Sequence, residues 1–316
     1  MDRRDFIRSG LALGAGVAVA PLAQQGALAA TRHLYQNGAS PWPLCLNAST
    51  IRPAAVRDKV RAAAAAGYDA MELWMQDLEE WEAQGEKLPT LKRAIEDEGM
   101  FVINVIGLWD CMPEGEEAFQ QSLELTKKRM EMSAAAGSRH VAVLPLPDRT
   151  PFDIAYATDK YRFLLEIGLN EFNIQPAMEF VSVFKGLRRL GQAMAIAVDA
   201  NHPKACIIPD TFHLYNGGSG FEGLRHVRGE FIASFHWNDV AAGMPPGELK
   251  DAERIYPGEG ALPLVESLRI LYVNNYRGPL SLELFRREHW ESDPMLVAKN
   301  GIEAMRKNVA AAMAES

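Results

Sequence analysis

Two short apolar runs, IQPAMEF (174–180) and ACIIPD (205–210), enclose a stretch of residues that favour a helix. Each run has the length and apolar character of a strand that is covered on both faces. Two parallel strands need a long crossover between them, and this crossover is usually a helix. The segment 174–210 therefore predicts a strand–helix–strand unit with two parallel strands.

The same unit repeats along the chain. Six more strand-like runs are LCLNA (44–48), DAMELW (69–74), FVINVIG (101–107), RHVAVLP (139–145), FIASFHWND (231–239) and PLSLELF (279–285). Eight strands, each followed by a helical stretch, predict an α/β fold of one domain, a single (β/α)8 TIM barrel. A doubly wound sheet is the rival fold, but no GxGxxG motif follows the first strand.

Helical stretches between these strands carry ordinary stop and start signals. AAVRDKVRAAAAAG (54–67) and EEAFQQSLELTKKRMEMSAAAG (116–137) each end at a glycine, which is a common end of a helix. A third helical stretch is YRFLLEIGLNEFN (161–173). The tail PMLVAKNGIEAMRKNVAAAMAE (294–315) begins with a proline, so we expect a final amphipathic helix.

The N-terminus has the features of an export signal. Arg3 and Arg4 precede the mild apolar run LALGAGVAVAPLA (11–23), and Ala27-Leu28-Ala29 follows as a small-x-small cleavage signal. These features resemble a twin-arginine signal peptide over residues 1–29. We expect cleavage after about Ala29 and a periplasmic location, with the barrel in residues 30–316; an uncleaved anchor is the alternative.

The net charge and the cysteine spacing limit which molecules and metals the protein is expected to bind. The formal charge is −8. Residues 1–29 hold three arginines and two aspartates, a net of +1, so the mature chain carries −9. Nucleic-acid binding needs a basic surface and is therefore disfavoured. None of the three cysteines, Cys45, Cys111 and Cys206, sits in a CxxC pattern, which argues against a thiolate zinc site but leaves a disulfide open.

Each of the last four predicted strands ends in a residue that can bind a metal. These residues are Glu179, Asp210, His236 and Glu283. Functional side chains of a TIM barrel gather at the carboxyl ends of its strands, and a buried carboxylate is costly unless it is paired or metal-bound. Three carboxylates and one imidazole favour Mn²⁺, Mg²⁺ or Co²⁺, with Zn²⁺ as an alternative.

Each of these residues also has an ordinary structural interpretation. Glu179 could pair with an arginine, Asp210 could cap the next helix, and His236 could be a core histidine with both nitrogens bonded. Glu283 could pair with Arg286 or Arg287. Four such coincidences on four successive strands are improbable, so the sequence favours a shared metal site.

Five short motifs carry a family resemblance. They are AMEF (177–180), PDTFHLYNGG (209–218), SFHWNDV (234–240), YPGEG (256–260) and SLELF (281–285). Their order and spacing resemble the xylose-isomerase-like TIM barrels, also called the sugar phosphate isomerase/epimerase superfamily, over essentially the whole mature chain.

The resemblance implies roles for particular residues. Glu179, Asp210, His236 and Glu283 match the family's metal ligands, and Glu179 and Glu283 match the acid/base pair of its ketose epimerases. His213 matches a histidine that contacts substrate. The turn Gly258–Gly260, with Arg254 before it, resembles a loop that closes over substrate.

Two departures from the family pattern matter. The stretches 181–185 and 241–245 lack the polar residues of the family's ketose epimerases, which argues against a simple free-ketose epimerase. Ala252 and Arg254 stand where the family's endonuclease branch has an Asp-x-His zinc pair, which disfavours DNA repair. Trp74 and Trp109, at the ends of the second and third strands, are expected either to stack on a sugar or to pack in the rim.

The leading hypothesis is a metal-dependent isomerase or epimerase. It acts on a carbohydrate or keto sugar through an enediolate, with the two glutamates as acid and base. The second hypothesis is a keto-glycoside lyase or hydratase, or a keto-polyol dehydratase, on the same site; release of a leaving group distinguishes it. A non-catalytic carbohydrate-binding barrel is the third. The expected partner is a small carbohydrate, with no membrane after cleavage, and a homo-oligomer is left open.

Overall fold

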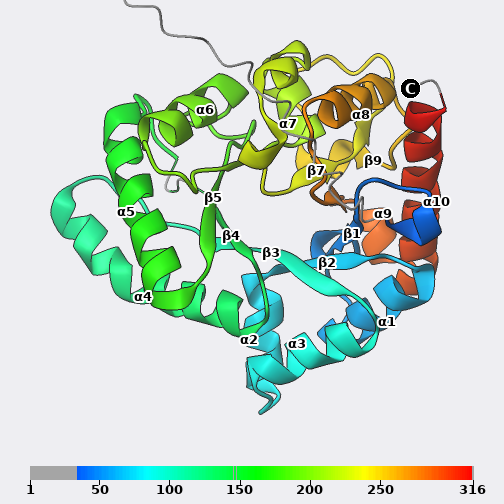
Figure 1. Cartoon of the computed structure of the whole chain (residues 1–316), viewed down its shortest axis with the longest axis horizontal. Helices are drawn as coiled ribbons and strands as arrows, with labels where there is room; N and C mark the ends of the chain where they lie inside the picture. Colours follow the sequence, from blue (N-terminus) through cyan, green and yellow to red (C-terminus); the bar gives the residue numbers. More distant parts are fainter. Residues whose placement is uncertain (1–33, 145, 147, 315–316) are drawn as a thin grey trace, which may run out of the picture. The chain divides into compact units, whose positions relative to one another are not determined.

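The computed structural model describes residues 34–144, 146 and 148–314 (Figure 1). The predicted signal segment, residues 1–29, lies outside the described residues. The barrel strands are β1 (Leu44–Asn47), β2 (Ala70–Trp74), β3 (Phe101–Leu108), β4 (His140–Val143), β5 (Gln175–Glu179), β6 (Ile207–Ile208), β7 (Phe235–Trp237) and β10 (Leu280–Leu282). The helices are α1 (Val56–Ala66), α2 (Met75–Ala83), α3 (Leu88–Asp97), α4 (Glu116–Ala135), α5 (Ile154–Phe172), α6 (Leu190–Asp199), α7 (Thr211–Asn216), α8 (Leu264–Val273), α9 (Arg287–Trp290) and α10 (Pro294–Met313).

The eight strands form one parallel barrel. Their order in the sheet is β6-β5-β4-β3-β2-β1-β10-β7. The two edge strands meet through isolated parallel bridges, Ile207 with Ile232 and Asp210 with His236. The backbone N–H of Ala233 donates to Ile207 O at 3.0 Å across the same seam. The prediction of a single (β/α)8 barrel is confirmed.

Several elements differ in length from the predicted ones. Strand β6 covers only two residues, and the proline that follows it, Pro209, has no N–H with which to continue the ladder. Residues Gly229–Phe231 form a 3-10 turn, so β7 begins later than the predicted residue 231. Helix α5 begins at Ile154 rather than 161, because the Asp153 side chain caps it by accepting from Tyr156 N.

Side chains alternate between the inside and the outside of the barrel. Outward residues such as Leu44 and Met71 join the large apolar core between strands and helices. Inside, one small apolar group contains Cys45, Ala70 and Ile103. A second lines the β3 to β6 side of the interior, with Ile106 and Ile208 among its members. Polar side chains lie between these groups, and they position the site described below.

The structure also shows the state of the cysteines and the character of the helices. Cys45, Cys111 and Cys206 are buried and free in this structure, which answers the question that the sequence left open about a disulfide. Among the described residues, no helix combines the length and apolar character that a membrane crossing requires.

His140 provides a test of the barrel's dependence on pH. Burial is the main cause that lowers its pKa from an ordinary value near 6.5 to about 4, and its Nδ1 lies 3.3 Å from Ile103 O. The unfolded chain takes up a proton below pH 6.5, whereas the folded chain resists it. The contribution of His140 to the free energy of unfolding is therefore fully present above pH 6.5 and is lost as the pH falls toward 4.

We expect wild type to lose about 1 to 2 kcal/mol more than His140→Gln between pH 7 and about pH 5. Urea unfolding at both pH values measures this difference. His226→Gln, which changes an exposed histidine, is the control and should follow wild type. Parallel stability curves for wild type and His140→Gln would show that His140 has no such role.

Candidate active site

Four side chains converge at the carboxyl ends of consecutive barrel strands. Glu179 ends β5, Asp210 follows β6 and caps α7, His236 lies in β7, and Glu283 follows β10. His236 is in register with Asp210 on one side and with Ser281 on the other. Since side chains two residues apart on a strand share a face, Glu283 points into the barrel as Ser281 does.

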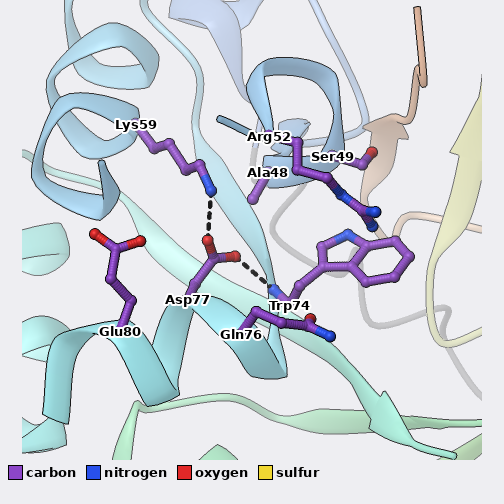
Figure 2. Close-up of a pocket in the computed structure, with 8 residues that line it drawn as sticks. All are labelled: Ala48, Ser49, Arg52, Lys59, Trp74, Gln76, Asp77 and Glu80. Atoms are coloured by element: carbon purple, nitrogen blue, oxygen red, sulfur yellow. Dashed lines mark hydrogen bonds and ion pairs between the residues drawn. The ribbon is translucent and has the colours of Figure 1, made fainter. Parts of the chain in front are cut away.

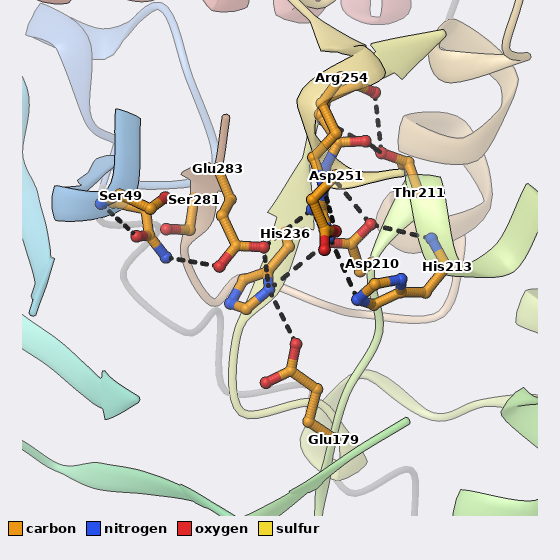
Figure 3. A network of polar contacts seen from close by, with 12 residues as sticks. Ser49, Glu179, Asp210, Thr211, His213, His236, Asp251, Arg254, Ser281 and Glu283 are labelled. Carbon is orange, nitrogen blue, oxygen red and sulfur yellow. Dashed lines mark hydrogen bonds and ion pairs between the residues drawn. The ribbon is translucent and has the colours of Figure 1, made fainter. Parts of the chain in front are cut away.

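The carboxylates surround one nitrogen of the imidazole (Figure 3). His236 Nδ1 lies 3.4 Å from Glu179 Oε1 and 3.2 Å from Glu283 Oε2. It lies 3.6 Å from Asp210 Oδ2. One potential ligand atom from each of Glu179, His236 and Glu283 lies within 4.8 Å of the other two. We call these four residues the candidate centre.

The candidate centre fits a divalent metal ion. Glu179 Oε2 and His236 Nδ1 are buried and have no hydrogen-bond partner among the described residues. Buried polar atoms are normally satisfied, so two such atoms in one place indicate a missing partner. A cation meets this need, and three carboxylates with one imidazole are suitable ligands. Metal binding by these residues remains a prediction.

Glu72, which the sequence analysis did not select, lies beside the candidate centre. Its Oε1 accepts from Asn104 at 2.7 Å and lies 3.1 Å from His236 Nε2. Its Oε2 accepts from Ser281 at 2.5 Å and from Asn47 at 2.9 Å. These bonds and the charge of His236 outweigh burial and lower the pKa of Glu72. With Nε2 bonded to this carboxylate, His236 presents Nδ1 to the other three.

A signal for Glu72 was present in the sequence. It lies in the strand AMELW in the same way that Glu179 and Glu283 lie in theirs, as a charged residue in an apolar run. Asn47 and Asn104 also interrupt apolar strands, and both are in register with Glu72. We call Asn47, Glu72, Asn104 and Ser281 the polar layer.

Arg254 lies directly on the candidate centre. Its Nη1 is 2.5 Å from Asp210 Oδ2 and 2.8 Å from Glu283 Oε2, and its Nη2 is 2.7 Å from Asp251. Glu283 therefore pairs with Arg254, not with Arg286 or Arg287 as its structural interpretation held. Asp210 does cap the next helix, by accepting from His213 N at 3.1 Å, and it also belongs to the candidate centre.

His213, a predicted substrate contact, is buried beside Arg254. Its Nε2 lies 3.2 Å from Arg254 Nη2, and its Nδ1 lies 2.9 Å from Ser182 Oγ. Burial lowers the pKa of His213 to about 4, so the ring is neutral at pH 7. His213 and Arg254, two of the three residues expected to contact substrate, thus lie next to the candidate centre, and their contact with substrate remains a prediction.

Burial and charge act in opposite directions on the candidate centre. Burial raises the pKa of Glu179 to about 7 in spite of the nearby His236 charge. Burial also acts on Asp210, but the Arg254 guanidinium and His213 hold the pKa of that carboxyl well below its usual range. Burial would lower the pKa of His236, yet Glu283, Glu72 and Glu179 raise it well above the usual value.

Asp239 organises the turn that was expected to close over substrate. Its Oδ2 accepts from the backbone N–H of Gly258 at 2.9 Å and of Gly260 at 3.0 Å. Its Oδ1 accepts from Leu262 N at 3.0 Å. The carboxylate is thus occupied by backbone donors, and it holds the turn around Gly258 and Gly260 in place.

An aromatic wall borders the site. Trp74 and Trp109 have ring centroids 6.0 Å apart, and the Phe285 ring lies 5.8 Å from that of Trp74. Trp109 is partly buried and packs against the interior apolar group of β3 to β6. It satisfies the packing interpretation, and its stacking on a sugar remains a prediction.

A parallel barrel with buried acids and a histidine at the carboxyl end of its strands has the architecture typical of TIM-barrel sites. Residues 60–308 match the family model described as the xylose isomerase-like TIM barrel. The chain belongs to this family.

Curated relatives include enzymes of two kinds. The chain is 27% identical to the inosose isomerase of Bacillus licheniformis over 56% of this chain and 64% of that enzyme. It is 24% identical to the inosose isomerase of Bacillus velezensis over 83% of this chain and 96% of that enzyme. The 3-dehydroshikimate dehydratase of Pseudomonas putida is 23% identical over 72% of this chain and 36% of its own length.

A solved structure supports the fold. The crystal structure described as the IOLI protein with a bound zinc atom superposes with a TM-score of 0.78 at 22% identity. The superposition covers 85% of this chain and 98% of that protein.

The bond from Glu72 to His236 leads to a test on metal affinity. Glu72→Gln keeps the shape of the side chain and removes its negative charge, so the imidazole becomes a weaker ligand. We expect Mn²⁺ to bind about 10- to 100-fold more weakly, as measured by competition with a chelator.

Glu86→Gln is the matched control, because that carboxylate is exposed and pairs with the exposed Arg57. Circular dichroism verifies that both variants fold. Equal Mn²⁺ affinity in wild type and Glu72→Gln would rule out the role of Glu72 in orienting His236.

Proposed function

We propose that the protein is a metal-dependent isomerase or epimerase that acts on a carbohydrate or keto sugar. The observation that carries this proposal is the pair of buried glutamates, Glu179 and Glu283, on either side of the unpartnered His236 Nδ1. Binding alone requires no pair of groups that can exchange protons. The inosose isomerase relatives support the reaction class.

The candidate centre would hold the ion through Glu179, Asp210, His236 and Glu283. A divalent ion there, Mn²⁺, Mg²⁺ or Co²⁺ with Zn²⁺ as the alternative, supplies Lewis-acid polarisation of a ketone. Glu179 and Glu283 lie on strands that flank β6 and β7, so they approach a bound ligand from two sides. One glutamate removes the proton from the carbon beside the ketone, and the other returns a proton.

A lyase or dehydratase is the second candidate. The Pseudomonas putida relative is named as a dehydratase, which favours this class. The first proton transfer is the same in both classes. They differ in the next step, since a hydroxyl or glycosyl group on the next carbon leaves instead of a proton being returned.

The cellular location of the reaction is also a proposal. The twin-arginine segment supports export to the periplasm, where an unphosphorylated keto sugar is a more suitable substrate than a sugar phosphate. Residues 1–29 lie outside the described residues, so processing of the secreted chain is the way to test this.

Metal content is the first prediction of the proposal. We expect about one divalent ion per chain in wild type after incubation with Mn²⁺, and its loss in Asp210→Ala, as measured by elemental analysis of desalted protein. Asp153→Ala is the matched control, because Asp153 caps α5 as Asp210 caps α7 but lies outside the candidate centre. Each variant loses a helix cap, at a cost of about 1 kcal/mol. Retention of metal in Asp210→Ala would contradict the site.

Proton exchange is the second prediction. We expect deuterium from D₂O to enter inosose or a ketose during turnover, and Glu179→Gln to slow this entry by about 100-fold or more. Nuclear magnetic resonance measures the label. Glu288→Gln, which changes an exposed glutamate of α9, is the control and should exchange like wild type.

The products distinguish the three classes. Labelled isomer without a leaving group supports the isomerase or epimerase. Release of water or an aglycone supports the lyase or dehydratase. Tight sugar binding without exchange or product, under any of the four metals, would leave the non-catalytic carbohydrate-binding barrel.

A further inference from the structure

A cavity of about 200 Å³ lies beside Trp74, outside the candidate centre (Figure 2). It is open to solvent on one side and is lined by residues of the 3-10 turn η2 (Ala48–Ile51), by Arg52, and by residues of α1 and the first turns of α2. Its lining residues are Ala48, Ser49, Arg52, Lys59, Trp74, Gln76, Asp77 and Glu80. The volume is sufficient for a small polar group of a ligand.

Arg52 is an exposed residue at the edge of the cavity, and its guanidinium lies against aromatic rings with its hydrogen-bond donors unused by any described residue. Its guanidinium carbon lies 4.3 Å from the centre of the Trp74 ring and 5.4 Å from that of Phe285. In the described part of the chain no acceptor or carboxylate pairs with this side chain. Arginine has five N–H donors in a planar fork and remains charged at neutral pH. The aromatic contacts thus hold a cation whose donors are free for a ligand.

The hydroxyl of Ser49, which also lines the cavity, is a second group without a hydrogen-bond partner among the described residues. Ser49 is fully buried. A buried hydroxyl without a partner costs free energy, which a ligand with an acceptor atom would recover. The amide of Gln76 lines the same space. Serine and arginine donors together match a ligand group that only accepts hydrogen bonds, such as a carboxylate.

Two acidic residues line the cavity. Asp77 is already paired with Lys59, and Glu80 lies away from Arg52 (Figure 2). Asp77 accepts from Lys59 at 2.6 Å and from Trp74 N at 2.8 Å. Glu80 accepts from Val56 N at 3.3 Å. Figure 2 shows Glu80 at the opposite side of the cavity from Arg52. An anion beside Arg52 would therefore avoid direct contact with either carboxylate.

One side chain connects this cavity to the candidate centre. Asn47 Nδ2 donates to Glu283 Oε1 at 3.2 Å, while Asn47 Oδ1 accepts from Ser49 N at 2.9 Å and from Trp74 Nε1 at 2.8 Å. The Phe285 ring lies close to two guanidiniums, at 5.4 Å from that of Arg52 and 5.1 Å from that of Arg254. A ligand with its ketone at the candidate centre is thus close enough to extend toward Arg52.

We propose that this cavity binds a carboxylate group of the substrate, with Arg52 as its charge partner and Ser49 as a hydrogen-bond donor. The substrate is then a keto sugar acid whose acidic end lies away from the reacting ketone. This inference rests on the proposed function, because it takes the candidate centre as the site of the ketone.

D-fructose and D-fructuronate test the proposal, since they differ only in a terminal hydroxymethyl or carboxylate group. Calorimetry measures their binding to the full chain with and without Mn²⁺. We expect wild type to prefer the acid by about tenfold or more, Arg52→Gln to abolish this preference, and Arg52→Lys to keep part of it. Ser49→Ala should weaken only the acid. Arg57→Gln is the matched control, because Arg57 also stacks on a tryptophan, 4.2 Å from the Trp81 ring.

The outcomes separate this inference from the proposed function. Equal affinities of wild type for the two sugars, a preference that persists in Arg52→Gln, or no binding of the acid would each overturn the inference. Failure of wild type to bind any of Mn²⁺, Mg²⁺, Co²⁺ and Zn²⁺ would refute the metal proposal alone. A preference for the acid that depends on Arg52 in metal-free protein would still support the cavity as a carboxylate site.

Discussion

The orientation of the His236 ring is the constraint on which the rest of the site depends. Its Nε2 is bonded to Glu72, and Glu72 in turn accepts from Asn47, Asn104 and Ser281. A buried carboxylate without such donors would be too costly to keep inside the barrel. The polar layer therefore exists because β1, β2, β3 and β10 present matching groups at one level. With Nε2 engaged, only Nδ1 of His236 can face the three carboxylates.

The barrel and the four residues of the candidate centre could be predicted because both depend on local patterns. Short apolar strands with helical crossovers specify the fold, and a charged residue near a strand end is conspicuous when the strand is otherwise apolar. Glu72 shows the same pattern, because it is a charged residue in an otherwise apolar strand. It was not predicted, since only the last four strands were considered as sources of metal ligands. Strand limits were less predictable, since Pro209 and the turn at Gly229–Phe231 end or delay hydrogen-bond ladders in ways that hydrophobicity does not report.

Arg52 and Ser182 could not be found from local patterns. Arg52 is an ordinary surface residue by sequence, and its position follows from aromatic side chains more than 20 and more than 230 residues away, Trp74 and Phe285. Ser182 lies in the stretch 181–185, which departs from the polar pattern of ketose epimerases, yet it contacts His213. Contacts between distant segments arise from the closed barrel, so only the folded chain reveals them.

The seam between β6 and β7 gives the candidate centre a further importance. These two strands meet only through isolated bridges in the described chain, and one bridge joins Asp210 to His236. An ion held by Glu179, Asp210, His236 and Glu283 would tie together β5, β6, β7 and β10 across this seam. A ligand that binds only the closed barrel stabilises that state by mass action. Binding of an ion by these four side chains would therefore stabilise the closed seam between β6 and β7 as well as supply the chemistry of the site.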